Sequence, residues 1–466
     1  MAPHKNDESP ASTTAPAAAT PKGSKLMNRS FKVEPELVVS AKGIHLHLAD
    51  GRTIIDGCGG AAVTCIGHGN EEVIEAMYEQ SKKVSYVHTQ SYVTSSAQEL
   101  ADFLLEGNPY GLEKAFFVGS GSEAVESAMK LAKQHFYELG ETQRVHFVSR
   151  RQAYHGNSMG SMSITSHLLR KRPYNDYGHQ HVSHVTPAFA YRYMKDGETE
   201  SQFSQRLVQE LEDEFLRVGP EKVIAFVAET IGGALPGCVA PPAGYFQGVR
   251  RVCDKYGILL IMDEIMCGTG RSGTFFAFEP EGASPDIMTV AKGLGGGYAT
   301  IAAVLATGKA LEPIRRGSSA FNSGHTYQAH PLACAAALAV QKIIRRDGLV
   351  ERCAKMGLLL EQKLRAQLAE CRSVGDIRGR GLFWAVEFVK DAQTKETFDP
   401  SLGYGTRVQQ AAFQMGVALY PGWTTVDGVR GDHVLFAPPF TVTEEELDTI
   451  VDVAKRAILS QEAQFL

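Results

Sequence analysis

The chain has 466 residues, of which 44% are hydrophobic and 21% are charged, an ordinary globular composition with ample material for a large core. Its 47 basic and 52 acidic residues leave a net charge of −5, and no block of lysine or arginine interrupts that balance, so we expect neither a nucleic-acid partner nor an anionic membrane partner. The eight cysteines form no Cys-X-X-Cys pair, which argues against a metal site or a redox motif and fits a reducing compartment.

The first 25 residues differ in composition from the rest of the chain. They are rich in alanine, proline, serine and threonine and lack the apolar stretch of a secretory signal, so we interpret residues 1–25 as a disordered tail. The acidic pair Asp7 and Glu8 argues against a mitochondrial presequence, and we expect a cytoplasmic protein. No run approaches the ~18 consecutive apolar residues of a membrane-spanning helix.

Structured sequence begins at Phe31. Alternating residues over 36–40 and 44–48, joined by a Lys42-Gly43 turn, predict a β-hairpin. Helical spacing follows at 71–83 and 95–107. The apolar run at 116–118 then enters a turn of glycine and serine, and a helix is predicted over 122–138.

Short apolar runs alternate with amphipathic segments through the middle of the chain. Strands are predicted at 145–148, 223–227, 258–262, 287–290 and 301–305, and helices at 204–217, 243–256 and 330–346. Continuous apolar strands separated by helices indicate an α/β fold with a mainly parallel sheet covered on both faces.

The pattern changes from about residue 350. This part of the sequence predicts a smaller α/β domain made of a helix, short strands near 382–388, a helix over 405–415, a further strand and a closing helix after Thr443. The N-terminal strands would complete this domain. We therefore expect residues 26–70 to form the N-terminal part of the small domain, 71–335 the large cofactor-binding domain, and 336–466 the C-terminal part of the small domain.

Three predicted strand ends carry unusual residues, and in parallel α/β sheets ligands bind at such ends. At the first, the small residues Gly119 to Ser122 would expose backbone N–H groups at a helix N-terminus, which suits a phosphate. A plain tight turn with a serine cap explains these residues about as well. A dinucleotide site does not, because a third glycine and an acidic residue on the following strand are missing.

The other two strand ends carry charged side chains. Asp263-Glu264 follows the strand at 258–262, although an isolated pair of this kind is more often a helix cap or a structural ion pair. Lys292 follows the strand at 287–290 and precedes a run of glycines, so a desolvated amine suited to Schiff-base chemistry is a better interpretation than a surface lysine. A phosphate cradle, a buried acid and a desolvated lysine together are what pyridoxal phosphate (PLP) requires of a protein.

On these residues the chain, from about residue 31 to its end, resembles the class III (omega-type) aminotransferases, PLP-dependent enzymes of fold type I. The matching segments are Ser120–Ala124, Tyr154–Gly156, Asp263–Ile265, Gly270–Gly273, Ala291–Gly293, His325–Tyr327, Arg378–Leu382 and Ala437–Pro439. The resemblance implies a large domain with a mainly parallel sheet and a small α/β domain built from both chain ends.

The resemblance also implies roles for residues of the reaction. Lys292 would form the internal aldimine with PLP and later move the substrate proton, and Asp263 would keep the pyridine nitrogen protonated. Glu229 resembles the acid of the family on the neighbouring strand, near Asp263 and the substrate.

Further residues would bind the cofactor by the same resemblance. Ser120, Gly121 and Ser122 would surround the phosphate, and Thr326 would reach it from the partner subunit of a homodimer with shared active sites. Tyr154 would stack on the ring with His155 beside it, while Ile265 would pack on the opposite face. For Tyr154 a core position, and for His155 a loop position, are the alternatives.

Two positions depart from the ornithine- and GABA-type members. Met266 stands where those members have a glutamine that contacts the cofactor, and Leu435 where they have an arginine that binds the substrate carboxylate. An apolar side chain cannot pair with a carboxylate, so the sequence favours the broader omega-transaminase group.

Three residues are candidates for substrate contacts. Arg430 lies in a loop expected to overhang the site and could bind a carboxylate, although pairing with Asp427 or Asp432 explains it equally well. Trp423 could shape the pocket. Tyr86 could face the substrate or pack in the core.

The resemblance implies a ping-pong aminotransferase that takes an amino group from an amine or amino acid and gives it to a pyruvate-like keto acid. Decarboxylases, aminomutases and racemases of the same fold would use the same cofactor residues and stay open as alternatives. A non-catalytic PLP-binding scaffold is a further alternative, against which the intact Lys292 and Asp263 argue.

Overall fold

A computed structural model describes residues 25–107 and 110–466. Of the predicted disordered tail, residues 1–24 lie outside the described part of the chain. Within that part, no helix combines the length and the apolar character needed to cross a membrane.

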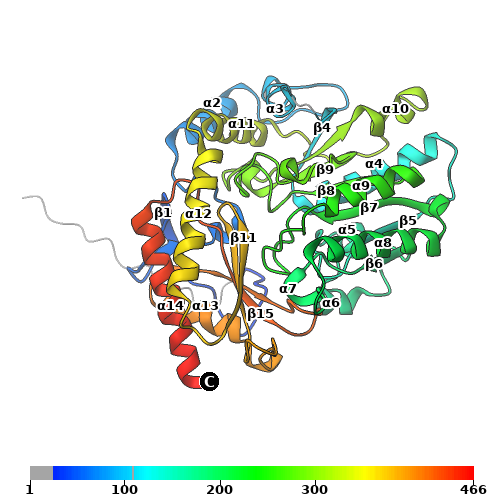
Figure 1. Cartoon of the computed structure of the whole chain (residues 1–466). Coiled ribbons are helices and arrows are strands. Elements are labelled where there is room, and N and C mark those ends of the chain that lie inside the picture. The colour runs from blue at the N-terminus through cyan, green and yellow to red at the C-terminus, as the bar shows by residue number, and fades with distance from the viewer. Residues whose placement is uncertain (1–24, 108–109) are drawn as a thin grey trace, which may run out of the picture.

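A seven-stranded sheet forms the centre of the larger half of the molecule (Figure 1). Its strand order is β4-β10-β9-β8-β7-β5-β6. The strands are β4 (Leu112–Val118), β5 (His146–Arg150), β6 (Val182–Val185), β7 (Val223–Glu229), β8 (Leu259–Asp263), β9 (Ile287–Val290) and β10 (Ala302–Thr307). The five strands from β9 to β6 pair in parallel, which confirms the predicted mainly parallel sheet.

Strand β10 is the exception, because it runs antiparallel to both of its neighbours. A parallel neighbour needs a crossover connection of roughly a dozen residues or more, usually containing an α-helix. The segment 291–301 between β9 and β10 is a glycine-rich loop with a single short 3₁₀ turn, Lys292–Leu294. The chain therefore turns back directly, and the loop that contains Lys292 stays at the sheet edge.

Helices cover both faces of this sheet, as its continuous apolar strands predict. They are α3 (Ser95–Leu105), α4 (Gly121–Glu138), α8 (Glu200–Val218), α9 (Tyr245–Tyr256) and α10 (Gly308–Arg316). Alternate strand residues such as Phe226 and Leu260 pack with α3, α8 and α9, whereas Val227 and Ile261 pack with α4 and α10. All seven residues of β7 are buried, as expected for a strand between two helical layers.

The smaller half of the molecule combines both ends of the chain (Figure 1). One sheet has the order β1-β2-β3-β13 and joins β1 (Val38–Lys42), β2 (His45–Leu48), β3 (Thr53–Asp56) and β13 (Val417–Ala418). The other has the order β11-β12-β15-β14 and joins β11 (Val374–Arg380), β12 (Phe383–Phe388), β14 (Tyr420–Trp423) and β15 (Asp432–Phe436). The pairing of β3 with β13 ties the N-terminal hairpin to the C-terminal segment.

The remaining helices are distributed over both halves of the molecule. They are α1 (Gly59–Ala62), α2 (Glu71–Lys83), α5 (Met159–Ile164), α6 (Leu168–Lys171), α7 (Ala190–Tyr193), α11 (Pro331–Arg346), α12 (Leu349–Gln367), α13 (Tyr404–Gln414) and α14 (Glu444–Phe465). Helices α11, α12, α13 and α14 contribute to one apolar core with β12 and β15. This core is separate from the two cores of the large sheet.

Candidate active site

A cavity of about 530 Å³ lies at the carboxyl ends of β7 and β8 and beside the loop after β9. This is the edge at which parallel α/β sheets place their ligand sites. The cavity brings together nine of the ten predicted cofactor residues: Ser120, Gly121, Ser122, Tyr154, His155, Glu229, Asp263, Ile265 and Lys292. Residues at or after the ends of five strands, β4, β5, β7, β8 and β9, therefore meet in one place.

Asp263 is the last residue of β8, and three donors hold its buried carboxylate. The imidazole Nδ1 of His155 lies 2.8 Å from Oδ2, and the backbone N–H of Ile265 donates to Oδ1 over 3.0 Å. The hydroxyl of Thr289 lies 3.4 Å from Oδ1. Because His155 Nδ1 faces a carboxylate, this nitrogen carries the proton and donates it. The carboxylate is thus fixed in orientation and faces the cavity.

Glu229 lies beside Asp263, because the last residue of β7 pairs in register with the last residue of β8. Its Oε1 accepts the N–H of Gly233 at 2.9 Å, and its Oε2 accepts the N–H of Tyr154 at 3.2 Å. Burial raises the pKa of Glu229, and the nearby negative charge of Asp263 adds to this effect. Two carboxyl groups with different surroundings therefore share one wall of the cavity.

Lys292 follows β9 and is half-buried in the cavity wall. Burial lowers the pKa of its amine, although the negative charges of Asp263 and Glu229 act in the opposite direction. Its backbone has a φ of 45°, a left-handed conformation that a residue with a side chain rarely adopts. Such conformations are concentrated at functional sites, where the surrounding structure holds them.

The N-terminus of α4 also lines the cavity. Ser120 caps this helix, since its hydroxyl accepts the N–H of Glu123 at 3.2 Å. Within the described part of the chain, the N–H groups of Gly121 and Ser122 have no hydrogen-bond partner. Free N–H groups and the helix dipole attract an anion to this point. A Cβ atom on Gly121 would lie 2.9 Å from Cδ1 of Ile265, so any other residue would require the Ile265 side chain to shift.

The other predicted site residues do not line this cavity. Thr326 lines a second cavity of about 700 Å³, which shares Gly119, Tyr298, Ala299 and Thr300 with the first. Tyr86 is 40% exposed, and its ring packs edge-on against Tyr327. Trp423, in β14, is 41% exposed.

Arg430 is exposed, and its Nε donates to Asp427 over 2.7 Å. The structure shows the pairing that the sequence offered as the alternative to a carboxylate-binding role. The geometry thus gives that role no support, and it stays a prediction.

Several lining residues were not predicted. Val63 comes from the N-terminal segment, Ala234 from the loop after β7, and Tyr298 and Thr300 from the loop after Lys292. The glycine run before Tyr298 was a signal for the last two. Nothing in the sequence pattern marks Val63 or Ala234, whose places depend on tertiary packing.

The two departures in sequence belong to one apolar cluster, and of these two residues only Met266 reaches the cavity. Met266 lines the cavity, and the fully buried Leu435 belongs to the same apolar cluster. The family's glutamine and arginine therefore have no polar substitute at these two positions.

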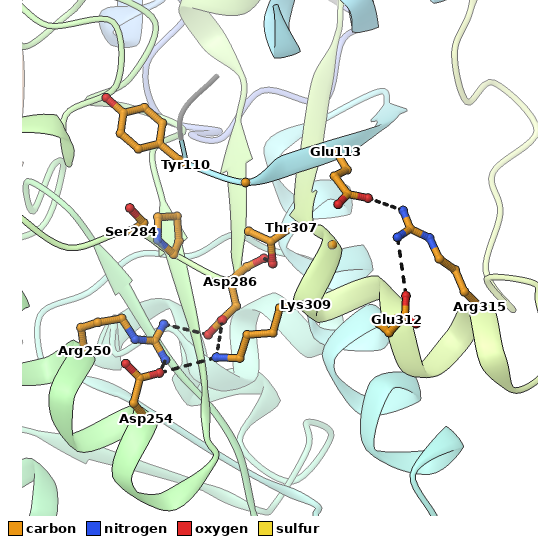
Figure 2. Close-up of a pocket in the computed structure, with 13 residues that line it drawn as sticks. Tyr110, Glu113, Arg250, Asp254, Ser284, Asp286, Thr307, Lys309, Glu312 and Arg315 are labelled. Carbon is orange, nitrogen blue, oxygen red and sulfur yellow. Dashed lines mark hydrogen bonds and ion pairs between the residues drawn. The ribbon is translucent and has the colours of Figure 1, made fainter. Parts of the chain in front are cut away.

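Another cavity, of about 570 Å³, lies near the start of β9, at the opposite edge of the sheet (Figure 2). Its charged residues pair with one another: Asp286 with Arg250 at 2.8 Å and with Lys309 at 2.9 Å, and Arg315 with Glu113. These charges are compensated, and we assign the cluster a structural role in joining α9, β9 and α10.

The comparison with known proteins decides the family. The family model described as aminotransferase class-III matches residues 27–458. This chain belongs to the class III aminotransferases. The resemblance seen in the sequence is thereby confirmed, and pyridoxal phosphate is the cofactor that the family implies.

Relatives of this aminotransferase cover nearly its whole length. An uncharacterized aminotransferase of Schizosaccharomyces pombe is 48% identical over 448 residues, which are 96% of this chain and 98% of the relative. A diaminobutyrate–2-oxoglutarate transaminase of Halomonas elongata is 35% identical and covers 91% of this chain and 90% of its own. The chain is therefore an enzyme of PLP-dependent transamination.

Solved structures agree with this assignment. The omega transaminase of Pseudomonas jessenii, solved in complex with PMP, has a TM-score of 0.87 and 33% identity, and the match covers 93% of this chain and 94% of that one. An (S)-enantioselective omega transaminase of Thermomicrobium roseum has a TM-score of 0.86 and 35% identity over 92% of this chain and 93% of that one. The α/β fold of this aminotransferase is the fold of these enzymes.

Proposed function

We propose that this aminotransferase moves an amino group from an amine or amino acid to a small keto acid such as pyruvate by a ping-pong mechanism, with Lys292 as the residue that carries PLP. The observation that supports this most is that Lys292 and Asp263 line one cavity with the N-terminus of α4, where two backbone N–H groups have no partner among the described residues. The family membership supplies the cofactor, and the geometry supplies the residues.

The cavity fits each part of PLP. Gly121 and Ser122, together with the hydroxyl of Ser120, would bind the phosphate. Asp263 would face the basic ring nitrogen, because its carboxylate is fixed by His155 and the N–H of Ile265. Tyr154 and Ile265 would hold the two faces of the ring. When bound, PLP acts as an electron sink for the substrate carbon that loses its proton.

The side chains of this protein then have distinct tasks. Lys292 has a lowered pKa, so a larger fraction of its amine is neutral and able to attack a carbonyl or to take the substrate proton. Asp263, oriented by three donors, would lie beside the ring nitrogen as its hydrogen-bond partner. Glu229 is held by two backbone N–H groups and would border the substrate side.

The apolar cluster bears on the substrate class. With Met266 and the buried Leu435 in place of polar residues, the cluster favours amines with an apolar substituent over ornithine or GABA. Two gamma aminobutyrate transaminases of Solanum lycopersicum are each 34% identical to this chain, so overall similarity does not decide the substrate class. The preference for apolar amines is our inference from these two positions.

We also propose a homodimer with shared active sites. The exposed apolar residues Tyr92 (66%), Val93 (73%) and Tyr327 (67%) need a covering surface, and Tyr327 adjoins Thr326 in the second cavity. Because that cavity shares four residues with the first, a partner seated there would border both. Thr326 would then act on the phosphate of the partner, as the family resemblance implies.

Separate half-reactions test the proposed function. With 1-phenylethylamine alone, the purified holoenzyme should form no more than one equivalent of acetophenone per site, and added pyruvate should restart turnover and yield alanine. Continuous turnover without a keto acid would instead indicate a racemase or aminomutase. Release of CO₂ from an amino acid supplied in place of the amine would indicate a decarboxylase. No observation on the described residues favours these alternatives.

A further inference from the structure

The backbone turn at Lys292 needs support from outside itself. Lys292 has a φ of 45°, and a conformation of this kind persists only where the surrounding structure holds it. The turn is closed by the Lys292 carbonyl, which accepts the N–H groups of Gly295 at 3.2 Å and Gly296 at 3.0 Å. Among the described residues, the next two carbonyls, those of Gly293 and Leu294, receive no backbone donor.

Gln341 supplies donors to both of these carbonyls. It lies on α11 and is fully buried, and its Nε2 donates to the carbonyls of Gly293 and Leu294, each over 2.9 Å. The thiol of Cys65 also donates to the Gly293 carbonyl, over 3.4 Å. The two hydrogens of one amide nitrogen thus hold the two carbonyls that follow Lys292.

The other end of the same amide shows that packing alone does not explain this residue. Within the described part of the chain, Oε1 of Gln341 has no hydrogen-bond partner. A buried amide oxygen without a partner destabilises the fold, and an apolar side chain of similar size would avoid this cost. The two bonds that Gln341 donates to the lysine turn are therefore the feature that an apolar residue on α11 could not provide.

The lysine turn is confined on its other side as well. A Cβ atom on Gly293 would clash with the hydroxyl of Thr269, which lies in the loop after β8. The strand β8 ends at Asp263, so the turn is held between α11 and the loop that follows this acid. Gln341 thereby helps to fix where Lys292 stands relative to Asp263.

We propose that Gln341 is a positioning residue, which fixes the direction of the Lys292 side chain through the backbone turn. This inference rests on the proposed function, in which the amine of Lys292 carries PLP and later takes the substrate proton. Both tasks need the amine at one place in the cavity, and a displacement of about 1 Å can lower a rate by about 100-fold. Gln341 is not among the described residues that line the cavity, so its effect passes through the turn.

The first test separates the binding of PLP from its capture by Lys292. Native and Gln341→Met apoenzymes are mixed with PLP, and absorbance is followed by stopped flow. The phase that depends on PLP concentration should be unchanged, because the N-terminus of α4 is intact. The later phase, in which the Lys292 amine attacks the aldehyde and water leaves, should slow by about 10- to 100-fold.

Pyridoxamine phosphate provides the matched probe. It has no aldehyde and forms no bond with Lys292, so it reports only on the cavity that surrounds the cofactor. We expect native and Gln341→Met apoenzymes to bind it with the same Kd. In the holoenzyme, kcat of Gln341→Met with 1-phenylethylamine and pyruvate should fall by about 10- to 100-fold, with the KM of both substrates within about twofold.

Gln341→Glu gives a pH-dependent readout. A carboxylic acid at this position can donate one hydrogen bond when it is protonated and none when it is ionised. Burial raises the pKa of such a group. The kcat of Gln341→Glu should therefore fall as the pH rises through that pKa, a step that the native enzyme and Gln341→Met should not show.

The control is Gln461→Met. Gln461 is also a buried glutamine on a helix, α14, and its amide donates to the hydroxyl of the adjacent Ser460 over 3.1 Å. This variant should keep native PLP capture and native kcat. Melting temperatures of both Met variants should be similar, so that a difference in capture is not a difference in stability.

Four results decide the matter. Native capture of PLP by Gln341→Met would overturn the proposal and leave Lys292 as the cofactor lysine. A joint loss of pyridoxamine phosphate affinity, PLP capture and melting temperature would show that Gln341 only supports the fold, which also overturns it. If Gln341→Met does not fold, a Gln341→Glu enzyme with the native pH profile would overturn it. Failure of the native apoenzyme to attach PLP to Lys292 would instead contradict the proposed function.

Discussion

At Asp263, three donors converge on one carboxylate in a buried wall, and this arrangement fixes the orientation that a partner for a ring nitrogen requires. The residue terminates β8, so the strand fixes its position and His155 fixes its orientation. A second acid, Glu229, ends the neighbouring strand in register. Their different surroundings give two chemically similar groups different tasks.

We expect Asp263→Asn to lower kcat by about 10²- to 10³-fold, because a neutral amide cannot stabilise positive charge on the ring nitrogen. The protein should still fold and bind PLP, since Asn has the same shape. Steady-state kinetics with alanine and pyruvate measure the loss. The control is Asp427→Asn in an outlying loop, and full activity of Asp263→Asn would contradict the assigned role.

Gly121 tests the phosphate end of the site. In Gly121→Ala, the new Cβ would crowd Ile265, and overpacking of this kind costs about 1–3 kcal/mol. We expect PLP affinity to fall by about tenfold or more, as measured by titration of the apoenzyme. In a double-mutant cycle, Ile265→Ala should recover part of the loss. A purely additive cycle would show that the crowding is not the cause.

The sequence predicted these residues because of their places at strand ends. A lysine before glycines and an acid after an apolar strand are visible in one dimension, and the fold brings them together by a general rule of parallel sheets. Val63 and Ala234 could not be found in this way, because their places in the cavity wall depend on tertiary packing. The Arg430 prediction relied on loop position alone, and the structure shows the local ion pair with Asp427.

At the scale of elements, long helices with clear caps matched the sequence best. Helix α2 covers the predicted residues 71–83, and Asn70 caps it through the N–H of Val73. The sequence analysis missed β6, a four-residue edge strand of sequence Val-Ser-His-Val with little apolar content. The reversal of β10 also could not be read from its composition, because strand direction depends on the connection and not on the strand.

Strand β15 contains a pH-sensitive residue. Burial lowers the pKa of His433 to about 3, and its Nδ1 lies 2.7 Å from the hydroxyl of Thr425. Below about pH 6.5 the unfolded chain takes up a proton that the folded chain refuses, so stability is lost as the pH falls, by up to about 1.4 kcal/mol per pH unit.

We therefore expect the melting temperature to drop between about pH 6.5 and 4.5, and His433→Gln to show a smaller drop over the same interval. Calorimetric scans of both proteins measure the difference. His181→Gln, at an exposed position, is the control and should keep the native slope. An unchanged slope in His433→Gln would exclude His433 as the responsible group.

At the scale of the whole molecule, the proposed dimer predicts a dependence of activity on assembly. Val93→Glu places a charge on the exposed apolar surface and should shift the protein to a monomer in analytical ultracentrifugation, with loss of activity. Leu216→Glu, on the outer side of α8, is a matched control that should remain a dimer. A fully active monomer of Val93→Glu would contradict shared active sites.

The division of the chain into domains at 26–70, 71–335 and 336–466 stays a prediction. The pairing of β3 with β13 and the separate core of helices α11 to α14 agree with a small domain made from both chain ends. The sequence could suggest a small domain made from both chain ends. Strand β13, which joins those ends, has only two residues and is too short to show a strand pattern.

The central claim is that Lys292 carries the cofactor, and chemical trapping tests it most directly. Borohydride reduction of the holoenzyme, followed by digestion and mass spectrometry, should find the pyridoxyl group on the peptide that contains Lys292, and Lys292→Ala should show no adduct. An adduct on another lysine, or none in a protein that is saturated with PLP, would contradict the account.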